Sequence, residues 1–283
     1  MQKNTLTRTL ANGNQMPPIG FGTWQLENGP VATKAVLDAL RTGYKMIDTA
    51  WAYRNEPSVA EAIEISQLPR EELFITTKLD TTMRGYEKAK NAIDESLKNL
   101  KTDYIDLYLV HWPASAQMFD NWQDINSETW RALEEAYASG KVKAIGVSNF
   151  RPHHLIPMIQ TADVMPMVNQ IEFHPGYMQN DITSFCREND ILIEAWSPLG
   201  SGRLIDNDTL KKIAAKYHKS VAQLCLRWCI QHGVIPLPKA TDLTYMKENL
   251  DVFDFEIAES DMVQIDGMPL TGFSDMDPDK VNW

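Results

Sequence analysis

The sequence has few cysteines and no long apolar run. Its 283 residues include three cysteines, Cys186, Cys225 and Cys229, and a low, odd number favours a reducing compartment over a disulfide framework. No apolar run approaches the roughly 18 residues that cross a membrane. Residues 1–18 also lack the apolar core of a secretory signal. We therefore expect a cytoplasmic protein with no membrane partner.

Positive charge is in deficit. The chain has 27 Lys and Arg against 38 Asp and Glu, a net charge of −11. Nucleic acids and anionic membranes are bound by clustered Lys and Arg, so we expect neither as a partner. An anionic ligand would have to be held by local cations and backbone N–H groups against the field of the whole protein.

Linkers and low-complexity tracts are also missing, which favours a single domain over residues 1–283. The composition, 43% hydrophobic and 23% charged, is ordinary for a globular protein and allows a large core. Near the N-terminus, Asn12-Gly13 lies in an alternating segment. This dipeptide predicts a β-hairpin.

Eight short apolar runs predict buried strands. They cover residues 19–24, 45–49, 73–78, 105–111, 144–150, 167–173, 191–198 and 234–239. Segments with helical spacing lie between them, and Ser220 with Gln223 forms a capping box before one such segment. This alternation predicts an α/β fold, a (β/α)8 TIM barrel after a short N-terminal β-hairpin. A doubly wound sheet is the alternative, but the stretch GFGTWQ at residues 20–25 lacks the third glycine of a dinucleotide fingerprint.

Polar residues stand at the C-terminal ends of these strands. Asp48 ends the second run with Tyr53 five residues on, Lys78 ends the third and His111 the fourth. Strand ends of a barrel share one rim, so we expect these four side chains to meet. A Lys ammonium held by a carboxylate would lower the pKa of a neighbouring phenol, and His111 would position a carbonyl oxygen. The alternative is a buried Asp48–Lys78 ion pair that only braces two strands.

Longer motifs around these residues resemble the aldo-keto reductase superfamily. They are GYKMIDTAWAYRNE at residues 43–56, ITTK before position 79, LYLVHWP at 107–113 and KVKAIGVSNF at 141–150. EAWSPLGSG at 194–202 and DVFDFE at 251–256 are most similar to bacterial reductases of the 2,5-diketo-gluconate reductase type. The resemblance implies an NAD(P)H-dependent oxidoreductase for carbonyl reduction, with Tyr53 as general acid assisted by Lys78, Asp48 and His111.

The resemblance also implies a nicotinamide cofactor in an extended pose across the rim. Ser148, Asn149 and Gln170 would bind the carboxamide, and Trp196 would stack on the ring. The remaining implied cofactor contacts are Gly22, Thr23, Trp24, Asp48, Ser197, Leu199, Gly200, Ser201, Lys239, Ala240, Thr241, Tyr245, Glu248 and Asn249.

One motif departs from the family pattern. Where the family has a hydroxyl residue and an Arg that bind the 2′-phosphate of NADP, this chain has Ala240 and Tyr245. A guanidinium is a bidentate phosphate ligand that a phenol does not replace. We expect a preference for NADP(H), with NAD(H) left open.

The substrate side has aromatic candidates. Trp24, Trp51, Trp112 and Trp283 would form an apolar mouth for a small-molecule carbonyl substrate, which Tyr53 and His111 would also contact. The alternative for Trp51 and Trp112 is packing beneath the loops. The family resemblance suggests a monomer. Two other functions stay open at this point: a cofactor-sensing subunit without turnover, and a barrel hydrolase or phosphate-sugar isomerase.

We expect no metal site. Cys225, Cys229 and His232 share one helix face, but the sequence offers no fourth ligand nearby. The only candidate for a phosphate loop of the isomerase type is GSGR at residues 200–203.

Overall fold

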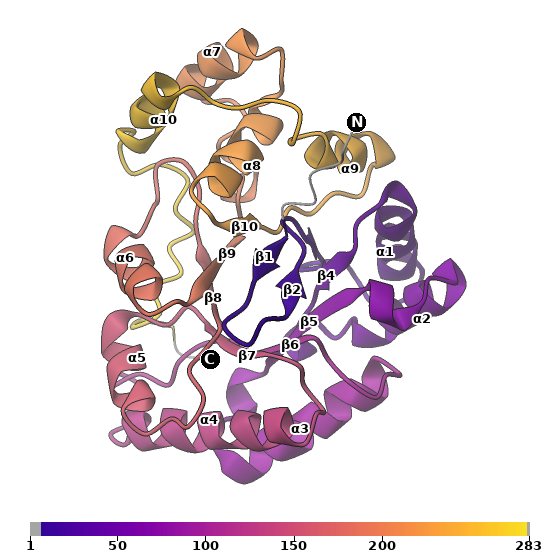
Figure 1. Ribbon diagram of the computed structural model, residues 1–283, viewed down its shortest axis with the longest axis vertical. Helices are drawn as coiled ribbons and strands as arrows, with labels where there is room; N and C mark the ends of the chain where they lie inside the picture. The colour runs from indigo at the N-terminus through magenta and orange to yellow at the C-terminus, as the bar shows by residue number, and fades with distance from the viewer. Residues whose placement is uncertain (1–6, 282–283) are drawn as a thin grey trace.

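A computed structural model describes residues 7–281 of the protein. Its main sheet has eight parallel strands whose spatial order follows the sequence, from β3 to β10 (Figure 1). They are β3 Phe21–Gly22, β4 Met46–Asp48, β5 Phe74–Leu79, β6 Leu107–Val110, β7 Ile145–Ser148, β8 Val168–Glu172, β9 Leu192–Trp196 and β10 Ile235–Pro236. Seven of them lie within the apolar runs of the sequence, and β5 extends one residue past its run, to Leu79.

Backbone hydrogen bonds close this sheet on itself. Gly20 donates its N–H to the Pro236 carbonyl at 3.1 Å, and Gly22 donates to the Pro238 carbonyl at 3.0 Å. These bonds join the first strand to the last. The (β/α)8 barrel expected from the sequence is therefore confirmed.

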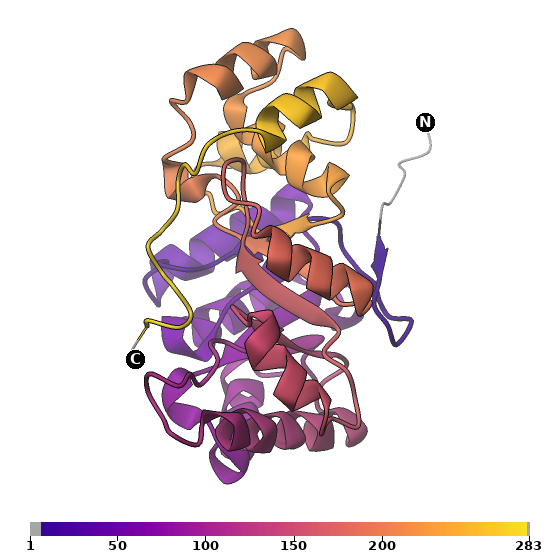
Figure 2. The same ribbon diagram turned by 90° about the vertical axis from the view of Figure 1, so that its left-hand side faces the viewer.

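The two ends of the barrel differ. The hairpin of β1 Arg8–Thr9 and β2 Gln15–Met16 lies at one end and the C-terminal segment at the other (Figure 2). Leu10 and Met16 of the hairpin are buried in one cluster with the barrel-lining side chains Leu107 and Val168. The hairpin thus plugs the end where the strands begin, which leaves the carboxyl ends of the strands for a site.

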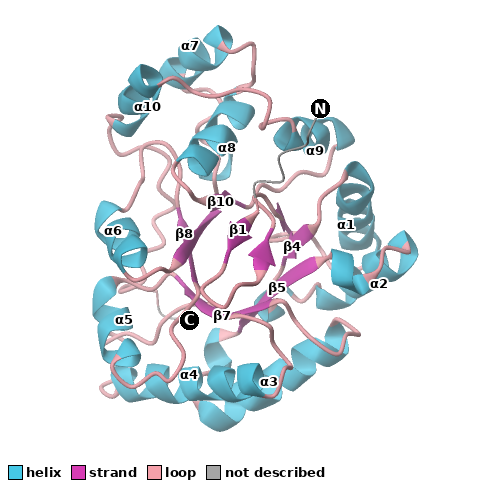
Figure 3. Ribbon diagram, in the orientation of Figure 1, coloured by secondary structure: helices cyan, strands magenta, loops and turns pink. Residues whose placement is uncertain are grey.

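Helices surround the barrel (Figure 3). They are α1 Pro30–Thr42, α2 Glu56–Ser66, α3 Tyr86–Asn99, α4 Trp122–Ala138, α5 Pro152–Ile159, α6 Asn180–Glu188, α7 Asp208–Lys216, α8 Val221–Gln231, α9 Leu243–Leu250 and α10 Glu259–Asp266, with 3₁₀ turns η1 Trp51–Tyr53, η2 Arg70–Glu72, η3 Thr81–Met83 and η4 Gly200–Gly202. The capping box of Ser220 and Gln223 is present at the start of α8, as expected. Within residues 7–281 no helix is long and apolar enough to cross a membrane.

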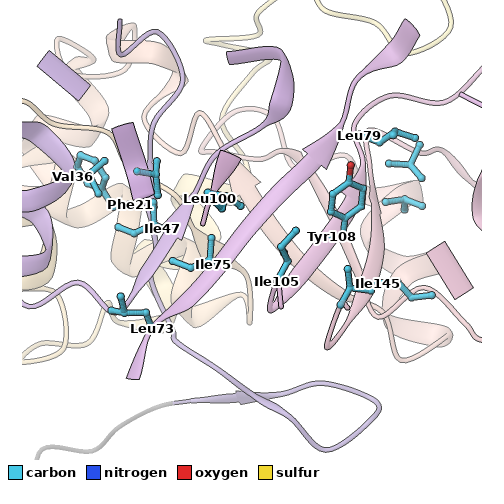
Figure 4. Packing of buried hydrophobic residues seen from close by; sticks show 14 of the residues in the cluster. Phe21, Val36, Ile47, Leu73, Ile75, Leu79, Leu100, Ile105, Tyr108 and Ile145 are labelled. Atoms are coloured by element: carbon cyan, nitrogen blue, oxygen red, sulfur yellow. The ribbon is translucent and has the colours of Figure 1, made fainter. Parts of the chain in front are cut away.

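Side chains alternate between the two faces of each strand. Ile47, Ile75, Tyr108 and Ile145 belong to the core between sheet and helices (Figure 4). Met46, Leu107, Val168 and Ile235 belong to the separate cluster inside the barrel. Because of this two-residue period, side chains two positions further along each strand also face the barrel interior.

Gly146 reflects how tightly the barrel interior is filled. A Cβ at this position would lie 2.5 Å from the Val168 carbonyl oxygen and 2.8 Å from the Leu109 side chain. Only glycine allows β7 to approach β8 this closely.

Candidate active site

Inside the barrel, polar side chains lie next to the apolar cluster, on the side of the carboxyl ends of the strands. Asp48 follows Met46 on the same face of β4, and Gln170 follows Val168 on β8. Gln170 Nε2 donates to Asp48 Oδ2 at 2.9 Å, although their strands lie on opposite sides of the barrel. This bond therefore crosses the interior, and it fixes the inward direction of both side chains.

Lys78 and Asp48 form a buried ion pair. Lys78 Nζ donates to Asp48 Oδ1 at 2.7 Å, to Asp48 Oδ2 at 2.8 Å and to the Thr49 carbonyl at 2.9 Å. The Lys78 side chain is 0% exposed. Burial lowers the pKa of Lys78, but Asp48 and then Tyr53 more than offset this, so that the pKa is raised. The ammonium is thus held charged at the centre of the site.

Tyr53 comes from η1, the turn after β4. The Lys78 ammonium lies 5.1 Å from the centroid of its ring. Lys78 does lower the pKa of the phenol, as expected, but the net pKa is raised. Burial raises the pKa of Tyr53, and the opposing effect of Lys78 only partly offsets it. A phenol taken out of water holds its proton, because its anion is poorly solvated there.

His111 lies directly beside this phenol. The rings of Tyr53 and His111 meet edge to face, with centroids 5.6 Å apart. Burial, then Lys78 and Arg84, hold the pKa of His111 well below its usual range. His111 is therefore a neutral imidazole at neutral pH, able to donate a hydrogen bond but carrying no charge.

Asn149 links several residues of the rim. Its Nδ2 donates to the His111 carbonyl and to Ser148 Oγ, both at 3.1 Å. Its Oδ1 accepts from Trp196 Nε1 at 2.8 Å. Ser148 Oγ in turn donates to the Gln170 carbonyl at 2.8 Å. Asn149 and Ser148 thereby orient the Trp196 ring and the strand ends.

The loop after β9 has an unusual backbone. Ser197, Gly200, Ser201 and Gly202 all have positive φ, between 52° and 88°. The Ser197 and Ser201 hydroxyls lie 2.7 Å apart, and the Leu199 side chain is half-buried. Turns that mix left- and right-handed residues gather backbone N–H groups into concave anion sites.

The segment after β10 contains the departure from the family pattern. Ala240 is buried, whereas Tyr245 on α9 is 61% exposed. Lys239 Nζ donates to Gln25 Oε1 at 3.2 Å, which brings together the loops after β10 and β3. Thr241 is exposed.

The last two residues of this motif, Glu248 and Asn249, differ in solvent exposure. Glu248 is half-buried and Asn249 is buried. Asn249 forms a hydrogen bond that lowers the pKa of Tyr44, although burial of Tyr44 has the larger, raising effect.

The aromatic residues proposed for the substrate mouth differ in exposure. Trp24 is 41% exposed, Trp51 is half-buried beneath the Arg54 guanidinium at 3.4 Å, and Trp112 is buried. Trp24 follows Gly22 and Thr23, and Thr23 donates its N–H to the Asp48 carbonyl at 3.0 Å. Trp283 lies outside the described residues.

Three features of the site did not follow from the sequence reasoning. Arg84, buried, donates to the carbonyls of Trp112 and Pro113 at 3.0 to 3.3 Å. Met276 and Pro278 of the C-terminal segment line a hollow together with Trp196. Glu194 faces the barrel interior beside Gln170. Only Glu194 left a signal in the sequence, because a carboxylate in the middle of an apolar run is unusual.

Metal ligation has one geometric candidate within residues 7–281, the group of His153, His154 and Asp279. His154 Nδ1 accepts a hydrogen bond from the Arg151 N–H at 3.2 Å, so a neutral His154 carries its hydrogen on Nε2, which faces Asp279 at 3.0 Å. That nitrogen is a donor to the carboxylate and has no lone pair for a metal. The group joins the C-terminal segment to α5.

Comparison with known proteins shows the family of this chain. The sequence model of the Aldo/keto reductase family matches residues 18–269. Glyoxal reductase of Bacillus subtilis is 47% identical over 262 residues, which cover 93% of this chain and 92% of that protein. Methylglyoxal reductase DkgA of Escherichia coli is 40% identical over 258 residues, 90% of each chain. A solved structure of a Gox0644 variant in complex with NADPH has a TM-score of 0.91 at 37% identity and covers 99% of this chain and 100% of that one.

The barrel and these matches thus define an oxidoreductase that acts on carbonyl compounds. The family model and the relatives match most of the chain. The chain belongs to the aldo/keto reductase family.

Proposed function

We propose that this protein reduces small aldehydes and ketones to alcohols with NADPH, and that Tyr53 donates the proton. The observation that carries the proposal is the Tyr53 phenol beside both the Lys78–Asp48 ion pair and the neutral His111. A phenol that keeps its proton at neutral pH, next to a fixed positive charge, suits protonation of an oxygen that becomes an alkoxide.

The rim residues fit a nicotinamide dinucleotide. Both hydrogens of the Gln170 amide are donated to the carboxyl groups of Asp48 and Glu194, so its oxygen remains to accept from a carboxamide. The Trp196 ring, fixed by Asn149, offers a flat half-buried face. The positive-φ loop from Ser197 to Gly202 suits a pyrophosphate. When bound, the reduced cofactor supplies a hydride.

The chain's own residues would perform the rest of the reaction. The carbonyl carbon gains the hydride while its oxygen takes the proton of the Tyr53 hydroxyl. The Lys78 ammonium, held by Asp48, stabilises the resulting phenolate. His111 donates a hydrogen bond from its neutral ring and orients the carbonyl. The phenolate recovers its proton from solvent after the alcohol leaves.

For the cofactor we propose NADP(H) as the preferred form, with NAD(H) as an accepted substitute. The Gox0644 variant was solved with NADPH, and Lys239 and Thr241 stay at the rim for a 2′-phosphate. Ala240 and Tyr245 supply neither a hydroxyl beside Lys239 nor a guanidinium, so discrimination should be weak.

For the substrate we propose small reactive dicarbonyls such as glyoxal and methylglyoxal. The names of two relatives of this chain specify these compounds as substrates. Trp24 and Trp51 would form the mouth. We further propose that the chain acts as a single-domain monomer in the cytoplasm.

Consumption of NADPH in the presence of methylglyoxal tests the proposal directly. We expect saturable consumption that depends on the aldehyde. Tight NADPH binding without turnover on any aldehyde or ketone would instead identify a cofactor-sensing subunit.

A further inference from the structure

Glu194 is a buried carboxyl group with no part in the proton transfer proposed above. It lies on β9, paired in register with Gln170 of β8, and is 0% exposed. Its Oε2 accepts from Gln170 Nε2 at 2.9 Å, and the same nitrogen donates to Asp48 Oδ2 at 2.9 Å. One amide therefore bridges two carboxyl groups inside the barrel.

The charged groups that act on Glu194 come from the far strands. Asp48 of β4 is negative and Lys78 of β5 is positive. The residues paired in register with Glu194 carry no charge, since they are Gln170 on β8 and Ile235 on β10. The other acid of β8, Glu172, is bonded to Ser274 and His174. Lys78 already gives its three hydrogens to Asp48 and Thr49. An ionised Glu194 would therefore add a negative charge that no cation balances.

The hydrogen bonding of Glu194 also favours its neutral form. Its Oε1 is buried and has no hydrogen-bond partner among the described residues. A buried carboxylate with one donor for two oxygens is far more costly than a neutral acid in the same place.

We propose that Glu194 is a positioning residue that carries its proton during carbonyl reduction, and that loss of this proton slows the reaction. The neutral acid anchors the Gln170 amide and leaves the Lys78–Asp48 pair electrically balanced. The inference rests on the proposed carbonyl reduction.

The physical link runs through Lys78. Burial, and then the charge of Asp48, raise the pKa of Glu194 to about 8, against smaller lowering effects of Gln170 and Lys78. Ionised Glu194 is one of the smaller charges that raise the pKa of Lys78, so the two groups interact. Once Glu194 is ionised, its charge offsets the stabilisation that the ammonium gives to the phenolate of Tyr53. Proton donation by Tyr53 then becomes harder.

The test is the pH dependence of kcat for methylglyoxal at saturating NADPH in the wild type, Glu194→Gln and Glu56→Gln. Glu56 is a matched control, because it is also buried but bonds to Thr77 and Asn99 outside this cluster. We expect the wild type and Glu56→Gln to lose activity above about pH 8, by about tenfold one pH unit past the pKa. Glu194→Gln should not show this loss of activity at high pH.

If kcat of Glu194→Gln decreases at high pH as in the wild type, or if kcat of Glu56→Gln does not decrease, the role proposed for Glu194 is wrong. A wild type inactive at every pH would instead refute the proposed function itself. Carbon-13 spectra of the wild type labelled at glutamate carboxyl carbons give a second readout that needs no variant. We expect one glutamate to titrate near pH 8, and titration of every glutamate in its ordinary acidic range would also overturn the inference.

Discussion

Lys78 Nζ donates hydrogen bonds to both carboxylate oxygens of Asp48, at 2.7 and 2.8 Å, inside the barrel. Neither side chain reaches solvent to any useful extent, since they are 0% and 6% exposed. Each charge therefore depends on the other for its solvation. We propose that the pair serves both the stability of the barrel and the chemistry of Tyr53, and variants can separate the two.

Lys78→Met should destabilise the fold by about 3–5 kcal/mol, because it leaves Asp48 buried without its cation. The double variant Lys78→Met with Asp48→Asn should recover much of that loss, since no charge of the pair remains. Reduction of methylglyoxal should be lost in both. Urea unfolding measures the stability and NADPH consumption the activity. A double variant as unstable as Lys78→Met would show that the unpaired charge is not the cause.

Restoring the family's phosphate contacts should sharpen cofactor choice. Tyr245→Arg with Ala240→Ser should tighten NADPH binding by about tenfold, through new charge-assisted hydrogen bonds to the 2′-phosphate. NADH has no such phosphate, so its Kd should stay within about twofold and serves as the internal control. Fluorescence titration measures both constants. An unchanged Kd for NADPH would mean that the phosphate is bound elsewhere.

Glu194 should make stability depend on pH. Its pKa in the folded protein, about 8, lies above the ~4.3 of an unfolded glutamate. The stabilisation linked to its bound proton is complete below the unfolded value and is lost as pH rises through the folded value.

Glu194→Gln removes this linkage, so its Tm relative to the wild type should increase from pH 5 to about pH 8 and level off above that value. Thermal unfolding at several pH values tests this. Glu56→Gln supplies the baseline for replacing a buried glutamate. A Tm difference that is the same at every pH would argue against a proton held by Glu194.

Arg151 should affect substrate binding through the C-terminal segment. It pairs with Asp277 at 3.0 Å, and the neighbouring Met276 and Pro278 line the hollow beside Trp196. Arg151→Gln should raise the KM for carbonyl substrates about fivefold, the equivalent of a part-buried ion pair of ~1 kcal/mol. Lys280→Ala is the control, because Lys280 also pairs with Asp277 but is 77% exposed. Equal KM values in the two variants would exclude this anchoring role.

The strand pattern of the sequence was sufficient to predict the barrel and the positions of Asp48 and Lys78 at its rim. Apolar runs mark the strands, and the two-residue period puts the polar residue after each run on the inner face. Closure of the barrel through Gly20 and Gly22 depends on backbone contacts with the last strand, more than 200 residues away. No local pattern encodes such a contact.

The electrostatics of the site could not be predicted in the same way. The effect of Lys78 on Tyr53 was expected with the correct sign, but the larger effect of burial depends on the packed structure. The position of Glu194 beside Asp48 likewise depends on an amide from a third strand. Both are properties of distant segments brought together by the fold.

Replacement of Tyr53 by Phe tests the central proposal most directly. Phe keeps the ring beside His111 and removes only the hydroxyl that would donate the proton. We expect Tyr53→Phe to bind NADPH with a Kd within about twofold of the wild type and to lose at least about 10²-fold in kcat for methylglyoxal. A variant that binds NADPH and retains near-normal kcat would show that Tyr53 is not the general acid.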